Sequence, residues 1–380
     1  MERRIRSCGI LMLALSLSFS MLTFLPQKAA AAVEYETQKL LRLYYDEEAP
    51  YGNETPAEIY DWRNYENDGW EKWSVPLGNG YMGVVVFGRT ETERLQITEN
   101  SLSTPYLGGK VGGGMTNFGE IYMDFGHTNS EVKNYSRDLL LDEGTAHVNY
   151  TYNGVNYSRE LFASYPDKVT VVKLTADQAG KIDFTLRTEI PYLEDYYTDS
   201  EHGNALRGKT GTVTSAGDTI TWAGKFGAYE VKYEGQVKVI PEGGTVTAST
   251  DDNGNGCLKV SGANTAYVII GVGTNYPVGD SAIFAAANGK EELAKYPAPH
   301  QKVTELMTAA SGKSYEQLLA NHQADYKELF GRVKLNLGGT DGGKTTDQLV
   351  EDYKSGRFNH YLEALYFQYG RYLLICSSRK

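Results

Sequence analysis

Two short polar groups near the first expected strands have side chains that could contact a sugar. One is the turn Gly78-Asn79-Gly80, and the other is the run Glu99-Asn100-Ser101. Amide and carboxylate side chains suit sugar hydroxyls, because they offer hydrogen-bond donors and acceptors in a small space. The simpler interpretation is that Asn79 makes a tight turn and that Glu99 and Asn100 end a strand. Both interpretations stay open, and these three residues are our candidates for lying close to a substrate.

Three tryptophans lie just before this turn in the sequence. Trp62, Trp70 and Trp73 could form an aromatic platform on which a pyranose ring stacks. Packing in the core or at its rim is the alternative, because aromatic side chains pack more often than they bind ligands. Trp73 is the nearest to the turn, so it joins the candidates.

The sequence lacks the common motifs for metals, phosphates and nucleophilic catalysis. Residues 251–256 begin like a calcium loop, but position twelve is Gly262 instead of glutamate, so a hairpin turn is expected. The glycine-rich residues 108–114 lack the ending of a phosphate loop, and there is no nucleophile elbow. The six histidines have no ligand spacing. We therefore expect no metal and no cofactor. Four asparagines start sequons, which matter only where a host attaches glycans: Asn53, Asn134, Asn149 and Asn156.

The first 32 residues have the pattern of a secretory signal peptide. Three arginines precede an apolar stretch at 9–26, and the small residues Ala29 to Ala32 fit cleavage after Ala31 or Ala32. An uncleaved anchor is the alternative, but a full span needs about 20 strongly apolar residues. We expect a secreted or extracytoplasmic protein that leaves the membrane after cleavage.

Charge and cysteine content narrow the class further. The formal net charge of −11 disfavours nucleic acid and anionic membranes as partners and fits a neutral ligand. After cleavage only Cys257 and Cys376 would remain, which is too few for a disulfide framework. Both are expected to be free.

From about residue 34 to 272 the pattern predicts strands. Asn153-Gly154 is a strong two-residue hairpin signal between strands at 145–152 and 155–162. Many strands at short spacing indicate a large antiparallel β-sandwich. The other expected strands are 82–87, 93–97, 168–174, 182–188, 219–222, 229–239, 245–248 and 266–272.

After Pro277 the pattern becomes helical. Helices are expected at 291–295, 301–309, 315–330, 346–354 and 360–377, with one returning strand at 332–337. Ser314 and Gln317 have capping-box spacing before the third of these helices. The last helix carries an apolar stripe at three-four spacing, and the sequence offers nothing to bury it against. This predicts a truncated domain and self-association of the chain.

At this point the residues carry a resemblance to a known family. The run Pro76-Leu-Gly-Asn-Gly-Tyr-Met-Gly83 and six further blocks resemble, in order and spacing, the amino-terminal part of glycoside hydrolase family ninety-five, best known for alpha-L-fucosidases. The blocks are 76–88, 93–102, 118–125, 134–142, 157–167, 325–333 and 366–379. The family commonly has a tryptophan shortly after the Glu-Asn pair, where this sequence has Ser103.

The resemblance implies a fold and implies that the catalytic residues lie in one of its domains. The implied fold is mainly β: a large antiparallel β-sandwich at 33–275, a helical linker at 276–345, and the first helices of an incomplete (α/α)6 barrel at 346–380. In the family the barrel hydrolyses the glycosidic bond with inversion of configuration at the anomeric carbon. A glutamate is the general acid, and asparagine and aspartate position the attacking water. Those barrel motifs cannot be carried onto any residue of this sequence, so no catalytic residue is assigned.

Three functions are then open. The chain is part of an exported glycosidase that acts on fucosylated or related glycans, inactive alone and built to pack against the rest of its barrel. Alternatively, it is a free-standing sugar-binding sandwich, or a structural β-module without a sugar site.

Overall fold

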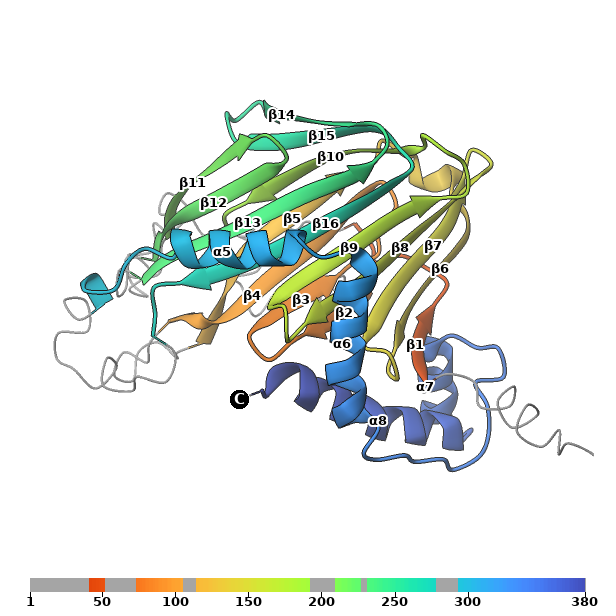
Figure 1. The fold of residues 1–380 in the computed structure, drawn as a ribbon. Coiled ribbons are helices and arrows are strands. Elements are labelled where there is room, and N and C mark those ends of the chain that lie inside the picture. Colours follow the sequence, from red (N-terminus) through yellow and green to blue (C-terminus); the bar gives the residue numbers. More distant parts are fainter. Residues whose placement is uncertain are drawn as a thin grey trace, which may run out of the picture. The chain divides into compact units, whose positions relative to one another are not determined.

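The computed structural model describes residues 41–51, 73–104, 114–191, 209–226, 231–277 and 293–379. The predicted signal peptide, Trp62, Trp70 and most of the glycine-rich loop lie outside these ranges. The described chain is mainly β and forms a large antiparallel sandwich with four helices (Figure 1). None of the helices within these ranges combines the length and the apolar character that a membrane-spanning helix requires.

The sandwich has two layers. One sheet has nine strands, in spatial order Arg42–Tyr45 (β1), Lys133–Leu140 (β6), Thr145–Tyr152 (β7), Val155–Ser164 (β8), Val169–Ala176 (β9), Thr265–Thr274 (β16), Val231–Glu242 (β13), Thr219–Phe226 (β12) and Lys209–Ala216 (β11). The other has seven, in the order Thr245–Thr250 (β14), Gly256–Ala263 (β15), Ile182–Glu189 (β10), Gly114–Asp124 (β5), Thr92–Thr104 (β4), Met82–Val86 (β3) and Val75–Gly78 (β2).

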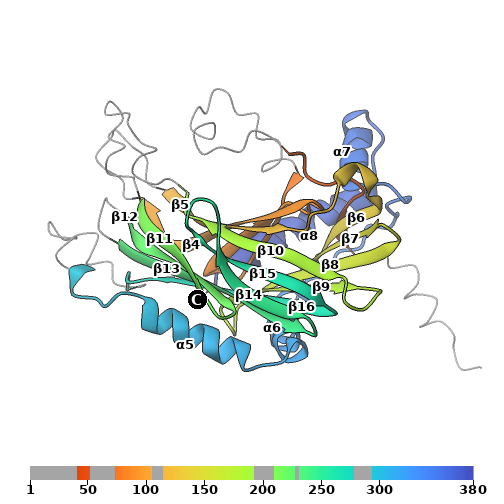
Figure 2. The ribbon, with the colours of Figure 1, turned by 90° about the horizontal axis from the view of Figure 1, so that it is seen from above.

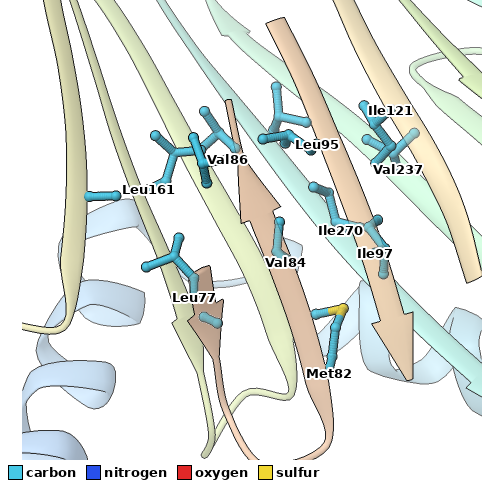
Figure 3. Close-up of a cluster of buried hydrophobic side chains, with 14 of the residues drawn as sticks. Leu77, Met82, Val84, Val86, Leu95, Ile97, Ile121, Leu161, Val237 and Ile270 are labelled. Carbon is cyan, nitrogen blue, oxygen red and sulfur yellow. The ribbon is translucent and has the colours of Figure 1, made fainter. Parts of the chain in front are cut away.

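Period-two alternation explains why these segments form strands around one core. In β3, Met82, Val84 and Val86 are buried, while the residues between them are half-buried. Leu95 and Ile97 continue this inner face on β4. Figure 3 shows these side chains meeting Leu161, Val237 and Ile270 from the facing sheet. Burying both inner faces is the main stabilisation of the sandwich.

The predicted hairpin is confirmed. Asn153 and Gly154 have φ values of 50° and 74°, as a two-residue turn with both central residues left-handed requires. β7 and β8 pair directly on either side, from Tyr152 with Val155 to Thr145 with Phe162. The turn in this way fixes the register of the outer-face residues on both strands.

Four helices follow the strands: His300–Ser311 (α5), Tyr315–Phe330 (α6), Thr346–Lys354 (α7) and His360–Ser377 (α8). The predicted capping box at α6 is confirmed, because Ser314 accepts from the Gln317 amide and the Gln317 side chain accepts from the Ser314 amide. α5 and α6 cover part of the outer face of the nine-stranded sheet, and Figure 2 shows α5 on that side. Val303, Met307 and Leu318 form a second apolar cluster there with the sheet.

One prediction in this region is wrong. Residues 333–337 form no strand: Val333 and Leu337 are exposed, and the Val333 carbonyl accepts from Gln368 and Arg371 instead of from a neighbouring strand. Alternating apolar residues suggested a strand, but a strand needs a partner edge. Of the residues expected to be helical at 291–295, 293 and 294 are helical, 295 lies in a turn, and 291–292 lie outside the described ranges.

The sequence predicted that the apolar stripe of the last helix has no partner, but the structure buries part of it. Leu365 and Tyr372 of α8 are buried and join the sandwich core, and α8 contacts α6 and β2. The exposed apolar side chains of α8 are a different set: Tyr366, Phe367, Leu373 and Leu374. Only Tyr366 and Leu373 of this exposed set belong to the stripe that the sequence predicted, which consists of Leu362, Leu365, Tyr366, Tyr369, Leu373 and Cys376.

Candidate functional site

Asn79 forms the turn between β2 and β3 and uses its whole amide for this. Its Oδ1 accepts from the Tyr81 and Met82 amides at 3.0 and 2.8 Å, and its Nδ2 donates to the Ser164 carbonyl at 2.9 Å. The side chain is buried, and Gly80 beside it has a φ of 78°. The expected tight turn is therefore confirmed, and Asn79 also ties β3 to the end of β8 in the other sheet.

Glu99 lies beside this turn, because Met82 and Glu99 pair between β3 and β4. Its carboxylate accepts from the Ser101 and Leu102 amides and from the Ser101 hydroxyl at 2.7–3.0 Å. Ser101 in turn reaches Thr274 of the other sheet at 2.5 Å. Burial raises the pKa of Glu99, although these hydrogen bonds and the nearby Lys302 act against the rise. The carboxylate is enclosed and joins the two sheets.

Asn100 and Trp73 differ from the other two candidates. Asn100 is exposed, and its Nδ2 lies 3.4 Å from the Gly80 carbonyl, so it borders the same turn. Trp73 precedes β2 at the opposite end of that strand. Its carbonyl accepts from Arg137, and the Arg137 guanidinium lies 5.9 Å from its ring centroid. The structure therefore brings Asn79, Glu99 and Asn100 together and leaves Trp73 apart.

The β2–β3 turn contacts the carboxyl end of α8 directly. The Gly80 amide donates to the Cys376 carbonyl at 2.7 Å, and the Tyr372 hydroxyl donates to the Pro76 carbonyl at 2.7 Å. A Cβ at Gly78 would lie 2.7 Å from the Cys376 carbonyl oxygen, so only glycine allows this approach. We call this contact, together with the residues of α6 and β8 that border it, the sandwich–helix junction.

Two ion pairs also connect the parts of the chain that form the junction. Arg379 pairs with Asp325 of α6 at 2.5 Å through both carboxylate oxygens and lies 4.1 Å from the Tyr165 ring centroid. Asp167, after β8, pairs with Lys313 at 2.5 Å and accepts from Asn321 of α6. Four parts of the chain, far apart in sequence, are in this way fixed to one another.

The chemistry available at the junction is limited. Glu99, Asp167 and Asp325 each have hydrogen-bonded or charged partners, and Glu99 and Asp167 are also buried. Each carboxylate is engaged within the protein, so none of them is assigned as the acid or the base of a hydrolysis. Within the described ranges, no group of three or more His, Cys, Asp or Glu side chains could hold a metal ion. The junction is suited to holding the helices in place.

Sequence reasoning missed Tyr372, Asp325 and Arg379. Tyr372 could have been found, since it lies on the same helical face as Leu365, seven positions earlier. The pairing of Arg379 with Asp325 has no sequence signal, because it depends on how α8 crosses α6. The predicted substrate contacts themselves stay predictions.

Two family models match the chain. The model described as glycosyl hydrolase family 65, N-terminal domain, matches residues 54–104 and 103–278, which is more than half of the chain. The model described as glycosyl hydrolase family 95 catalytic domain matches residues 314–380. The first match covers most of the sandwich, and the second covers α6, α7 and α8.

Curated relatives agree with these matches. The chain is 25% identical over 363 residues to "Alpha-L-fucosidase 2" of Arabidopsis thaliana and 27% identical over 349 residues to "Probable alpha-fucosidase A" of Aspergillus niger. Each alignment covers 80% of this chain, but only 40% and 41% of the relative. The chain thus spans about two fifths of the length of these relatives.

A solved structure described as "Putative kojibiose phosphorylase from human microbiome" overlaps 89% of this chain and 43% of its own, with 13% identity and a TM-score of 0.45. Through residues 54–278 the chain belongs to the glycosyl hydrolase family 65 N-terminal domain family, and as a whole it resembles the amino-terminal part of the family 95 alpha-fucosidases.

Proposed function

We propose that this chain is the amino-terminal part of an alpha-L-fucosidase-type glycoside hydrolase, in which the sandwich holds the first helices of the catalytic domain in position. The observation that carries the proposal is the sandwich–helix junction. It joins the part matched by the family 65 model to the part matched by the family 95 catalytic model through Gly80–Cys376 and Pro76–Tyr372. The activity that we propose for the longer protein is inverting hydrolysis of alpha-L-fucosyl or related glycans, as in family 95.

We further propose that the chain alone does not hydrolyse glycosides. Inverting hydrolysis needs a proton donor and a base on opposite faces of the sugar, separated by room for a water. The carboxylates of the junction are enclosed or ion-paired, as Glu99 and Asp325 illustrate. They support a positioning role for this part of the molecule.

A direct test is hydrolysis of a chromogenic alpha-L-fucoside by the purified chain. We expect no turnover above the buffer rate. Measurable turnover that survives repeated purification would contradict the proposed inactivity and would place an acid–base pair within these residues.

A second test is to sequence the transcript beyond codon 380. We expect the reading frame to continue with the rest of a family 95 catalytic domain. A stop codon with no such frame downstream would instead favour a free-standing, non-catalytic module.

We also propose that the protein is exported. The arginine-rich start, the apolar stretch at 9–26 and the alanines at 29–32 support this. Amino-terminal sequencing of protein from its natural source should begin at Ala32 or Val33, and an intact Met1 would contradict export with cleavage.

A further inference from the structure

An open hollow lies on the outer face of the nine-stranded sheet, far from the junction. It has a volume of about 510 Å³ and lies over β7, β8 and β9 near the Asn153-Gly154 turn. Asn156 and Ser164 lie near opposite ends of β8, so about 26 Å of strand separates the hollow from the junction, at about 3.3 Å per residue. In Figure 1, α5 and α6 cross the sheet away from the β7–β8 turn.

The floor of the hollow is a row of uncharged polar side chains. Asn149 pairs with Ser158, and Ser158 pairs with Thr175, so the three lie side by side across three strands. Among the described residues, the Asn149 amide and the Ser158 hydroxyl have no hydrogen-bond partner in the protein. These two groups are therefore available to a ligand.

The rim of the hollow is a chain of hydrogen bonds that fixes its shape. The Asn134 side-chain amide donates to the Thr151 hydroxyl at 3.2 Å, and this hydroxyl donates to the Asn156 side-chain Oδ1 at 2.7 Å. The Asn156 amide groups hold both oxygens of Asp177, at 3.0 and 2.7 Å. A rim held in this way loses little conformational freedom when it binds a ligand.

A backbone irregularity aims one of these side chains at the hollow. Asn134 has a φ of 52°, in the left-handed region, and lies where the register of β6 and β7 shifts between Lys133 and Ser136. Such bulges redirect side chains and often border functional sites. Here the bulge allows Asn134 to reach Thr151.

The lining indicates which ligand would fit. Amides, hydroxyls and one carboxylate line the hollow, with no cationic side chain among them. An anionic ligand would meet Asp177 without a counter-charge, whereas a neutral polyol can both donate to and accept from this set. We propose that the hollow is a surface binding site for a neutral oligosaccharide.

The test is saturation-transfer NMR on the full chain with three probes at millimolar concentration: lactose, fucosylated lactose and sialylated lactose. We expect transfer to the two neutral sugars and little to the anionic one. The choice of the fucosylated probe rests on the proposed function, whereas the proposed binding site does not depend on it. Binding of lactose alone would therefore support the site while counting against fucose as its preferred sugar.

Variants locate the binding on the molecule. The double substitution Asn149→Ala with Ser158→Ala should weaken neutral-sugar binding by about tenfold or more, because it removes the two free groups of the floor. Asn149→Phe should do the same by filling the hollow. Asn253→Ala, at an exposed turn between β14 and β15, is the matched control and should leave binding unchanged.

Three results would overturn the proposal. They are no saturation transfer to either neutral sugar, equal binding by the floor variants and the wild type, and a mass spectrum showing a glycan attached to Asn149 in protein from its natural source. The last would mean that the sequon is a modification site and that the hollow is already filled. Melting curves of each variant separate lost binding from lost folding.

Discussion

Asn79 and Asn100 carry the same amide and border the same turn, yet the fold uses them differently. Asn79 is 2% exposed and all its bonds go to the backbone, whereas Asn100 is exposed with one long bond. The sequence predicted that the turn and Glu99 lie near each other, because they stand at the ends of the adjacent expected strands 82–87 and 93–97. It could not decide which amide is buried, since that depends on Ser164 in the other sheet.

The first prediction separates these two residues. Asn79→Ala should lower the free energy of unfolding by about 1 to 3 kcal/mol, because two backbone amides and the Ser164 carbonyl lose their partner. Asn100→Ala, the control, should change it by no more than about 0.5 kcal/mol. Urea denaturation followed by tyrosine fluorescence measures both. Equal effects would show that Asn79 does not hold the turn.

At the scale of elements, local signals predicted the helices well. The observed ends of α6, α7 and α8 are those expected, since capping residues and apolar spacing are contained within each segment. Strands were predicted less completely. The expected strands did not include β1, β2, β5, β6, β11 and β15. Two of these, β11 and β15, are rich in small residues whose strand character comes from their neighbours in the sheet.

A charge ladder across four strands gives the second prediction. Asp138, His147, Glu160 and Lys173 are successive cross-strand neighbours on β6, β7, β8 and β9. Burial alone would lower the pKa of His147, but its hydrogen bonds to Asp138 and Glu160 raise this pKa to about 9. The imidazole is therefore charged at neutral pH in the folded chain.

Because the folded pKa of His147 is raised, the stability it contributes is complete below its unfolded pKa of about 6.5 and is lost as pH rises to about 9. The wild type should lose on the order of 3 kcal/mol more unfolding free energy than His147→Gln between pH 6 and pH 10. Denaturation at several pH values tests this, and parallel curves for the two proteins would refute it.

The third prediction concerns the contact between β2 and α8. Gly78→Ala should push α8 away from the turn, because the new Cβ would lie 2.7 Å from the Cys376 carbonyl oxygen. We expect faster amide hydrogen exchange near the end of α8 and a loss of about 1 to 3 kcal/mol in unfolding free energy. Gly370→Ala, in open space on the same helix, should instead stabilise it by about 0.5 to 1 kcal/mol. Unchanged exchange in Gly78→Ala would mean that α8 is not held by β2.

At the scale of the whole molecule, sequence patterns predicted two antiparallel layers but not their strand order. Hairpins such as β7–β8 are local, whereas β9 pairs with β16 and β10 with β5 across long separations. The burial of α8 was likewise missed, because Leu365 and Tyr372 are covered by the sandwich and α6. The apolar residues that stay exposed on α8 are those on its other side.

This second face of α8 gives the last prediction. Tyr366 and Leu374 are 80% and 65% exposed, and Phe367 and Leu373 lie beside them. An apolar patch of this kind favours association in water, so the sedimentation coefficient of the purified chain should rise with concentration. Leu374→Glu should reduce this rise, and Phe358→Ser, at an exposed residue outside α8, should not.

If the proposed function holds, the same Leu374→Glu substitution in a longer protein with a complete catalytic domain should lower its melting temperature, because the new charge would be buried. A chain that stays monomeric at every concentration would argue against an interface on this face.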